Sequence, residues 1–392
     1  MLDNDYKSLF GVLRNDIHYF DYAATTFMPK SVIEKWVEYQ NTIGVFHGKG
    51  KNILSNAAQD IMVESEKTIK KFLGAFEEYD FIYSKNTTEV INLVALSLEN
   101  EIKPMDYIMV GPYEHHSNYL PWKYLAQKQD AIFMEMPVDS DGNVDYEYIK
   151  QNNRRIKVMS VSSVANTNGY AINLDKLLSL VGEDTLFFVD ESQKLAHSRL
   201  TVNKKIAGHF LSSHKMYGPK NIAGALMKKE IIKKIPPILL GGGMVNTVGF
   251  NDTWADGKAK FEAGTMDIGA IYAWSEACRF IETIGFETIN KIDKYCHAEI
   301  YDVLNSNENI DIIQSGGSGV SSLISFTDKR LHAHDMEYIF SKKKILIRSG
   351  NLCSQNSIRK FNNYAINRIS FGVGVSEDDL SQLVDVLKEL QK

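Results

Sequence analysis

The stretch Leu211-Ser212-Ser213-His214-Lys215-Met216-Tyr217-Gly218-Pro219 decides between the possible folds of this chain. It places a lysine after two hydroxyl residues and a histidine, and a Gly-Pro turn follows. A lysine amine can form a Schiff base with an aldehyde cofactor, and nearby hydroxyls can bind a phosphate group. A loop lysine is more often simply solvated, so the rest of the chain must decide between these interpretations.

Length and composition indicate a globular protein with two domains. The chain has 392 residues, of which 44% are hydrophobic and 24% charged, and its net charge is -5. A negative charge argues against nucleic acid or an anionic membrane as a partner. The polar N-terminus has no apolar signal core, and no apolar run approaches the ~18 residues that span a bilayer. We therefore expect a cytoplasmic protein.

The three cysteines are Cys278, Cys296 and Cys353. An odd number at wide spacing argues against a disulfide framework and against a cysteine-based zinc site. Cys278 and Cys296 lie in helical patterns and are expected to be structural, so Cys353 is the one to consider for chemistry.

Short apolar runs alternate with amphipathic stretches over the first two thirds of the chain. This alternation predicts an α/β fold with a mostly parallel sheet, in which ligands bind at the carboxyl ends of the strands. The predicted strands lie at 81–83, 107–110, 131–134, 158–161 and 186–189, and predicted helices at 89–98, 120–128 and 174–181.

From about Tyr272 the pattern changes to long helical segments and a few strands, which predicts a smaller α+β domain. Helices are expected at 271–283, 286–304 and 377–391, with strands at 310–313, 322–326, 345–347 and 367–371. We therefore predict a large domain at 1–270 and a small domain at 271–392. The N-terminal arm is expected to join the small domain or a dimer interface.

Polar clusters follow the first predicted strands. After 81–83, Asn86 can cap a helix whose first turn holds Thr87 and Thr88, which predicts an anion site or plain N-capping. After 107–110, His115 can stack on an aromatic cofactor or move protons, although a capping or core histidine is an alternative. His115 and its neighbour His116 cannot converge on one ion, so we predict no metal site.

Further polar residues follow the next strands. Asn166 can donate a hydrogen bond to a ligand or simply occupy a turn. Asp190 ends an apolar strand, where a positively charged pyridinium nitrogen would offset the cost of a buried carboxylate; the alternative is a helix cap. Gln193 can reach the phenolic oxygen of the aldehyde cofactor that carries this pyridinium ring. The series of anion site, histidine, asparagine, aspartate and lysine is what a pyridoxal phosphate enzyme needs.

These residues resemble the class V pyridoxal-phosphate enzymes, and most closely the cysteine desulfurases of the short-loop branch near the selenocysteine lyases. The resemblance covers nearly the whole chain. It rests on Asp21-Tyr22-Ala23-Ala24-Thr25-Thr26, on Glu114-His115-His116-Ser117-Asn118 with Pro121-Trp122, and on Ser212-Ser213-His214-Lys215 with Gly218-Pro219. It implies the pyridoxal-phosphate transferase fold of type I and pyridoxal 5'-phosphate as cofactor.

The resemblance also implies a role for each candidate. Lys215 would carry the cofactor as a Schiff base and move protons, and His115 would stack on its ring. Asp190 would pair with the ring nitrogen and Gln193 with the phenolic oxygen. The phosphate would be held by Thr88, Ser212 and His214, with Thr87 as a further candidate.

The same resemblance implies the substrate contacts and the assembly. Asn166 and Arg368 would hold the substrate carboxylate, a task that suits the planar arginine fork. Thr265, in Glu262-Ala263-Gly264-Thr265, matches a threonine that reaches the partner subunit's phosphate, which implies a homodimer with shared active sites.

Cys353 follows Arg348 by five residues, as the sulfur-accepting cysteine does in cysteine desulfurases. There it attacks the substrate sulfur and becomes a persulfide, which requires a thiolate on a reachable loop. Polar neighbours favour exposure here, whereas a buried structural cysteine is the alternative. The chain departs from the family around the substrate, at Asn351-Leu352, at Ser354-Gln355-Asn356, after Thr265 and at 47–52.

We therefore predict a cysteine desulfurase that turns L-cysteine into L-alanine, with a persulfide on Cys353 and a sulfur-acceptor protein as a possible partner. The alternative is a class V aminotransferase, or another pyridoxal-phosphate lyase, acting on a different amino acid. A third hypothesis is a non-catalytic scaffold, against which Lys215, Asp190 and His115 argue.

Overall fold

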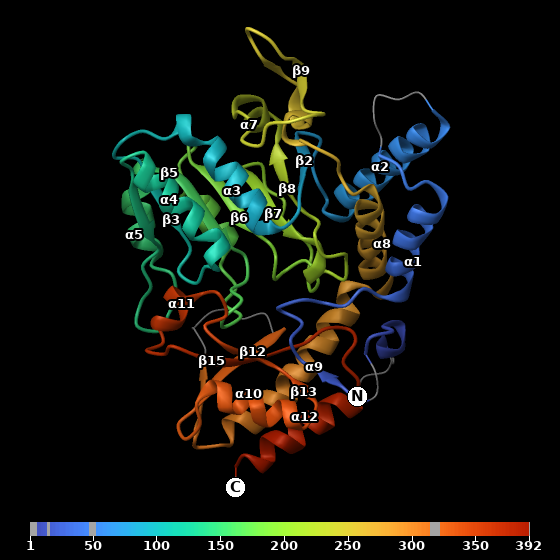
Figure 1. The fold of residues 1–392 in the computed structure, drawn as a ribbon. Helices are drawn as coiled ribbons and strands as arrows, with labels where there is room; N and C mark the ends of the chain where they lie inside the picture. The colour runs from blue at the N-terminus through green and yellow to red at the C-terminus, as the bar shows by residue number, and fades with distance from the viewer. Residues whose placement is uncertain (1–5, 14–15, 47–51, 314–321, 392) are drawn as a thin grey trace.

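The computed structural model describes residues 6–13, 16–46, 52–313 and 322–391, so most of the atypical stretch at 47–52 lies outside the described residues. Within these ranges the chain forms two parts, each a sheet with its helices (Figure 1). The first, called the first layer, is built on a seven-stranded sheet, and the second layer is built on a four-stranded sheet. Among the described residues, the helices are all too short or too polar to cross a membrane.

The seven-stranded sheet is mostly parallel, as the sequence predicts. β8 alone among its strands runs antiparallel to its neighbours on both sides. Most of the strands are buried along their length, because helices cover both faces. In sheet order the strands are β2 (Tyr79–Ser84), β8 (Ala223–Lys228), β7 (Ile206–Ser212), β6 (Leu186–Asp190), β5 (Ile156–Ser162), β3 (Tyr107–Val110) and β4 (Ile132–Glu135).

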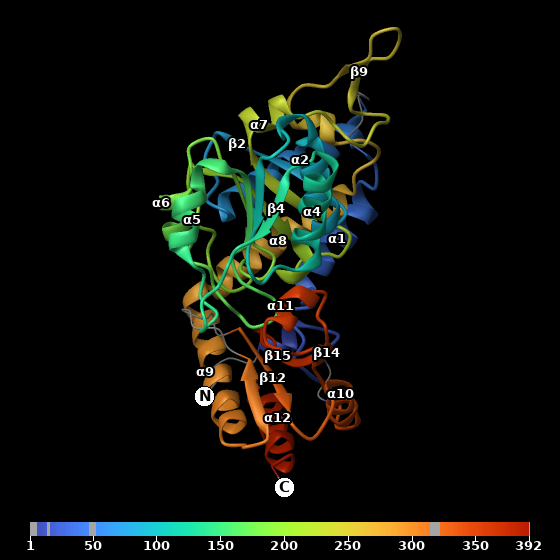
Figure 2. The ribbon, with the colours of Figure 1, turned by 90° about the vertical axis from the view of Figure 1, so that its left-hand side faces the viewer.

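Neighbouring residues of the strands pack into different apolar clusters, because side chains alternate between the two faces. Ile108 belongs to the cluster formed with α3 (Thr87–Ser97), α4 (Leu120–Lys128) and α7 (Lys229–Lys234). Met109 belongs to the cluster formed with α5 (Tyr146–Asn152) and α6 (Leu174–Leu180). Figure 2 shows α5 and α6 on one side of the sheet and α4 on the other.

Three further helices pack together beside β2 and continue the core: α1 (Lys30–Thr42), α2 (Ile53–Phe72) and α8 (Ile268–Ile284). The chain then enters the second layer with α9 (Phe286–Asn305), which packs on β11 and β12. The predicted division at residue 270 falls inside α8 and stays a prediction. A hairpin of β9 (Val245–Thr247) and β10 (Thr253–Trp254) projects from the top of the molecule (Figure 1).

The second layer holds an antiparallel sheet in the order β11 (Ile310–Ile313), β12 (Leu323–Asp328), β15 (Ile366–Ser370) and β14 (Arg348–Gly350). Its helices besides α9 are α10 (Ala333–Lys342), α11 (Gln355–Arg359) and α12 (Glu377–Glu389). The N-terminal arm joins this layer, because β1 (His18–Tyr19) pairs with β13 (Ile345–Leu346). Lys7 Nζ and His18 Nδ1 also reach Asp379 Oδ1 on α12, each at 2.7 Å.

Candidate active site

A cavity of about 530 Å³ lies where the carboxyl ends of the parallel strands meet the second layer. The turns after β2, β3, β5, β6 and β7 all contribute to it, as expected for a parallel sheet. Every predicted site residue except Thr265 lines this cavity: Thr87, Thr88, His115, Asn166, Asp190, Gln193, Ser212, His214, Lys215, Cys353 and Arg368.

Lys215 lies in the short turn Ser213–Lys215 directly after β7. The N-terminal segment fixes this turn, because Thr26 N donates to His214 O at 2.9 Å and Tyr217 N donates to Thr26 Oγ1 at 2.7 Å. Burial lowers the pKa of the Lys215 amine to about 8, although Asp190 opposes the shift. Part of the amine is therefore neutral near pH 7, as an attack on an aldehyde requires.

Asp190 ends β6 with only 6% of its surface exposed. Its Oδ1 accepts a hydrogen bond from Ser192 N at 2.9 Å, and burial raises its pKa. A nearby cation would restore its charged form. Gln193 Nε2 donates to Ala23 O at 2.8 Å, so the amide also ties the N-terminal segment to the cavity wall.

The N-terminus of α3 faces the cavity through Thr87 and Thr88. Asn86 caps the helix as predicted, because its Oδ1 accepts from Glu89 N at 2.9 Å. The free N–H groups of a first turn, together with hydroxyls, suit an anion. Thr88 Oγ1 lies 2.6 Å from Ser117 Oγ.

His214 lies beside Lys215, and its Nδ1 is 3.0 Å from Thr25 Oγ1. Burial lowers the pKa of His214 to about 4, so the ring is neutral at pH 7. Together with Ser212, which is buried at the end of β7, it can offer neutral hydrogen-bonding groups to the anion site at α3.

His115 is held with a defined tautomer. Its Nδ1 accepts from Ser117 N at 3.1 Å, so in the neutral ring the hydrogen is on Nε2. Burial lowers its pKa to about 3, helped by the charge of Lys215. A neutral aromatic ring on the cavity wall suits stacking on a flat ligand.

Glu114, next to His115, supports the site, a role that was not predicted from the sequence. It is buried, and its two oxygens accept from Ser162 N and Ser162 Oγ, each at 2.6 Å, and from Asn118 Nδ2 at 2.7 Å. Burial raises its pKa to about 7 despite these donors. A Cβ at Gly111 would lie 2.2 Å from Glu114 Oε1, so a side chain there would displace this carboxylate.

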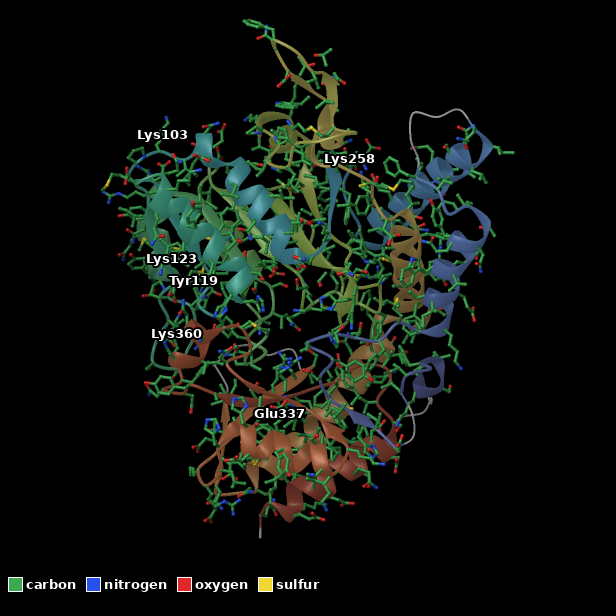
Figure 3. All side chains as sticks on the ribbon, viewed as in Figure 1. Lys103, Tyr119, Lys123, Lys258, Glu337 and Lys360 are labelled. Carbon is green, nitrogen blue, oxygen red and sulfur yellow. The ribbon has the colours of Figure 1, made fainter. Side chains whose placement is uncertain are left out.

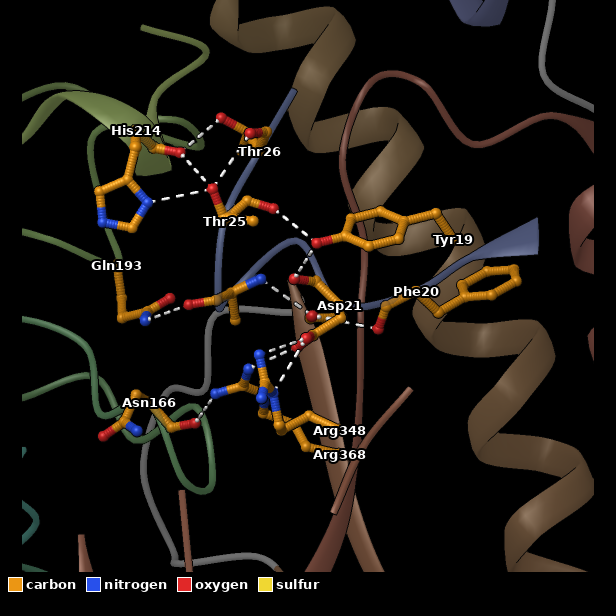
Figure 4. A network of polar contacts seen from close by, with 12 residues as sticks. Tyr19, Phe20, Asp21, Thr25, Thr26, Asn166, Gln193, His214, Arg348 and Arg368 are labelled. Atoms are coloured by element: carbon orange, nitrogen blue, oxygen red, sulfur yellow. Dashed lines mark hydrogen bonds and ion pairs between the residues drawn. The ribbon is translucent and has the colours of Figure 1, made fainter. Parts of the chain in front are cut away.

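Asp21, in the N-terminal segment, binds two arginines of the second layer that line the cavity (Figure 4). Its Oδ1 accepts from Arg368 Nη2 at 2.9 Å, and its Oδ2 accepts from Arg348 Nε at 3.0 Å. The sequence indicated Asp21 only as part of a motif, and Arg348 only through its spacing from Cys353. Charge complementarity alone could not have paired residues more than 320 positions apart.

Cys353 is exposed and lines the cavity, whereas Cys278 and Cys296 are buried in α8 and α9. The segment around Cys353 docks on the turn after β3, since His116 N donates to Cys353 O at 2.7 Å. Lys360, labelled in Figure 3, extends this contact by donating from Nζ to Pro112 O at 2.6 Å. The candidate nucleophile thus lies between the two layers.

Two predicted residues have surroundings that the sequence did not suggest. Asn166 lines the cavity, but its side-chain amide bonds to Leu352 and Ser354 on either side of Cys353. Thr265 is exposed and lies outside the cavity of its own chain. Within the part of the chain that the structure describes, no cluster of three His, Cys, Asp or Glu side chains could bind a metal ion.

This arrangement of lysine, aspartate and histidine around one cavity agrees with the comparisons to known proteins. The chain belongs to the aminotransferase class-V family, whose model matches residues 18–383. The fold is accordingly the pyridoxal-phosphate transferase fold of type I, as predicted.

Three relatives define the similarity further. A probable cysteine desulfurase of Staphylococcus aureus is 30% identical over 95% of this chain and 92% of its own length. A probable cysteine desulfurase of Pyrococcus abyssi is 33% identical over 97% of this chain and 96% of its own. The apo structure of a cysteine desulfurase from Thermococcus onnurineus superposes with a TM-score of 0.93 at 29% identity, covering 100% of this chain and 98% of that one.

Proposed function

We propose that the protein is a cysteine desulfurase dependent on pyridoxal 5'-phosphate, which converts L-cysteine into L-alanine and leaves the sulfur as a persulfide on Cys353. Its relatives bear the name of this activity. The observation that carries the proposal is the position of Cys353 on the same cavity as Lys215 and Asp190. An aminotransferase would need the lysine and the aspartate but not the exposed cysteine.

The residues of the cavity fit this cofactor. A lysine with a lowered pKa suits its aldehyde, and the buried Asp190 suits a protonated pyridine nitrogen. The neutral ring of His115 suits its aromatic face. The first turn of α3, with Ser212 and His214, suits its phosphate. When bound, pyridoxal 5'-phosphate supplies an electron sink for charge that develops on the substrate.

The substrate carboxylate binds at Arg368, whose Nε is buried and has no hydrogen-bond partner among the described residues. Lys215 would hold the cofactor through its amine and would move protons at the substrate carbons. The presence of these groups on the same cavity supports these roles.

Cys353 accepts the sulfur as its thiolate. A bond forms between Cys353 Sγ and the substrate sulfur as the carbon–sulfur bond of the substrate breaks. The bonding electron pair remains with the carbon, which takes up a proton. L-cysteine and the Cys353 thiol thus become L-alanine and a Cys353 persulfide without an external oxidant. A thiol or a sulfur-acceptor protein then removes the sulfur.

We further infer a homodimer with shared active sites. Thr265 lies outside its own cavity and is exposed, which supports a role toward the cofactor phosphate of a second copy. Light scattering coupled to gel filtration should give twice the chain mass of 44.4 kDa. A monomer that retains full activity would contradict this inference.

The experiment that tests the activity is a panel of amino acids given to the holoenzyme, with alanine, sulfide and keto acid measured together. L-cysteine with a reductant should yield alanine and sulfide in equal amounts. A keto acid without sulfide would favour an aminotransferase. A colourless protein that cannot take up the cofactor would favour the scaffold hypothesis.

A further inference from the structure

The turn that carries Cys353 contains two consecutive non-glycine residues in the left-handed backbone region. Leu352 has a φ of 50° and Cys353 a φ of 52°. This region is unfavourable for residues with a Cβ, so such a turn persists only where surrounding contacts hold it. The contacts on both sides of Cys353 therefore decide where its sulfur lies.

One side chain from the first layer holds the turn on both sides of the cysteine. Asn166 Nδ2 donates to Leu352 O at 2.8 Å, and Ser354 Oγ donates to Asn166 Oδ1 at 2.9 Å. Ser354 is fully buried and Asn166 is 6% exposed, so water does not compete for these bonds. Because each half of the amide has its own partner, the orientation of the amide is fixed.

Asn166 is also tied to the arginine proposed for the substrate. Arg368 Nη1 donates to the backbone oxygen of Asn166 at 2.9 Å. Under the proposed function, the group that binds the substrate carboxylate and the turn that presents the nucleophile therefore share one anchor. A shift of Asn166 changes the distance between the two reacting sulfurs.

We propose that Ser354 is a positioning residue for sulfur transfer, which acts through the Asn166 amide on the turn of Cys353. The proposal rests on the proposed function. Without the hydroxyl, Asn166 Oδ1 loses its donor, and the amide no longer holds both sides of the turn. Transfer between two sulfurs is sensitive to this, since a misplacement of about 1 Å can cost on the order of 10²-fold in rate.

The test compares Ser354→Ala with Ser357→Ala in the holoenzyme. Ser357 is also fully buried and close by in α11, but its hydroxyl makes only a 3.4 Å contact with Glu114 O and does not touch Asn166. For Ser354→Ala we expect kcat for alanine to fall about tenfold, with KM for L-cysteine within about twofold. Cofactor absorbance and Tm should match those of Ser357→Ala.

A second readout needs no turnover: the rate at which iodoacetamide alkylates Cys353 without substrate, followed by peptide mass. The buried thiols of Cys278 and Cys296, whose pKa values are raised by burial, should stay unmodified. Release of the turn should raise the alkylation rate of Cys353 in Ser354→Ala about threefold or more. Ser357→Ala should react like the wild type.

Three results would overturn the proposal. In the first, Ser354→Ala matches the wild type in both kcat and alkylation rate, and in the second, Ser357→Ala loses as much kcat as Ser354→Ala. In the third, Ser354→Ala raises KM and leaves kcat unchanged. The last would make Ser354 a substrate-binding residue. A wild-type holoenzyme that forms no alanine from L-cysteine would instead refute the proposed function. In that case the alkylation rates still decide whether Ser354 holds the turn.

Discussion

Arg368 Nη2 and Asp21 Oδ1 form an ion pair at 2.9 Å, with side chains that are 3% and 10% exposed. Asp21 follows β1 in the N-terminal arm, and Arg368 lies in β15 of the second layer. The pair neutralises a buried guanidinium, whose Nε has no hydrogen-bond partner among the described residues. The N-terminal arm thus orients the residue that we assign to the substrate carboxylate.

Arg368→Lys should weaken substrate binding. An ammonium group cannot reproduce the planar fork that contacts Asp21, Asn166 and a carboxylate together. We expect KM for L-cysteine to rise about tenfold or more, with a smaller change in kcat, in steady-state assays of alanine. Arg330→Lys, a partly exposed arginine paired with Asp328, is the control. An unchanged KM in Arg368→Lys would remove Arg368 from the substrate site.

Lys215→Ala should abolish covalent attachment of the cofactor, because the variant has no amine at the end of β7. Borohydride reduction followed by peptide mass should find the cofactor on the Lys215 peptide of the wild type and on no peptide of the variant. Lys220→Ala, an exposed lysine five residues away, should behave like the wild type. Attachment at another lysine would contradict the assignment.

Loading of the apo protein with the cofactor should accelerate as pH rises through about 8. The pKa of Lys215 is lowered to about 8, so the amine is mostly protonated at pH 6.5 and mostly neutral at pH 9. Because the neutral amine attacks the aldehyde, the loading rate should rise with pH and level off above the pKa of Lys215.

The two neutral histidines should add no inflection to this profile, because burial lowers their pKa values to about 3 for His115 and about 4 for His214. Stopped-flow absorbance between pH 6 and 9.5 measures the rate. A rate that does not change across this range would show that Lys215 is not the titrating nucleophile.

Five of the seven strands of the first layer are predicted from the sequence, whereas β7 and β8 are not among the predicted strands. Runs such as 107–110 and 158–161 are mostly apolar because helices cover both faces of the strands, and both lie in the seven-stranded sheet. The polar residues that follow the strands then meet at one edge, as predicted. The direction of β8 could not be predicted, because its apolar run, 222–227, is compatible with either orientation.

The contacts around Cys353 could not be predicted. Ser354 and Asn166 are 188 positions apart, and a pair of polar side chains has no periodicity to reveal it. Asp21 and Arg368, which also pair, are 347 positions apart. Only the assembly of both layers brings these residues together, so the sequence indicates the candidates but not which of them bond to each other.

The most direct test of the central claim is the fate of the sulfur on Cys353. Holoenzyme is mixed with less than one equivalent of L-cysteine and no reductant, and alanine and the mass of the Cys353 peptide are measured. We predict one added sulfur atom on that peptide for each alanine formed, and no alanine from a Cys353→Ala variant that still binds the cofactor. Full alanine turnover by Cys353→Ala would contradict the account.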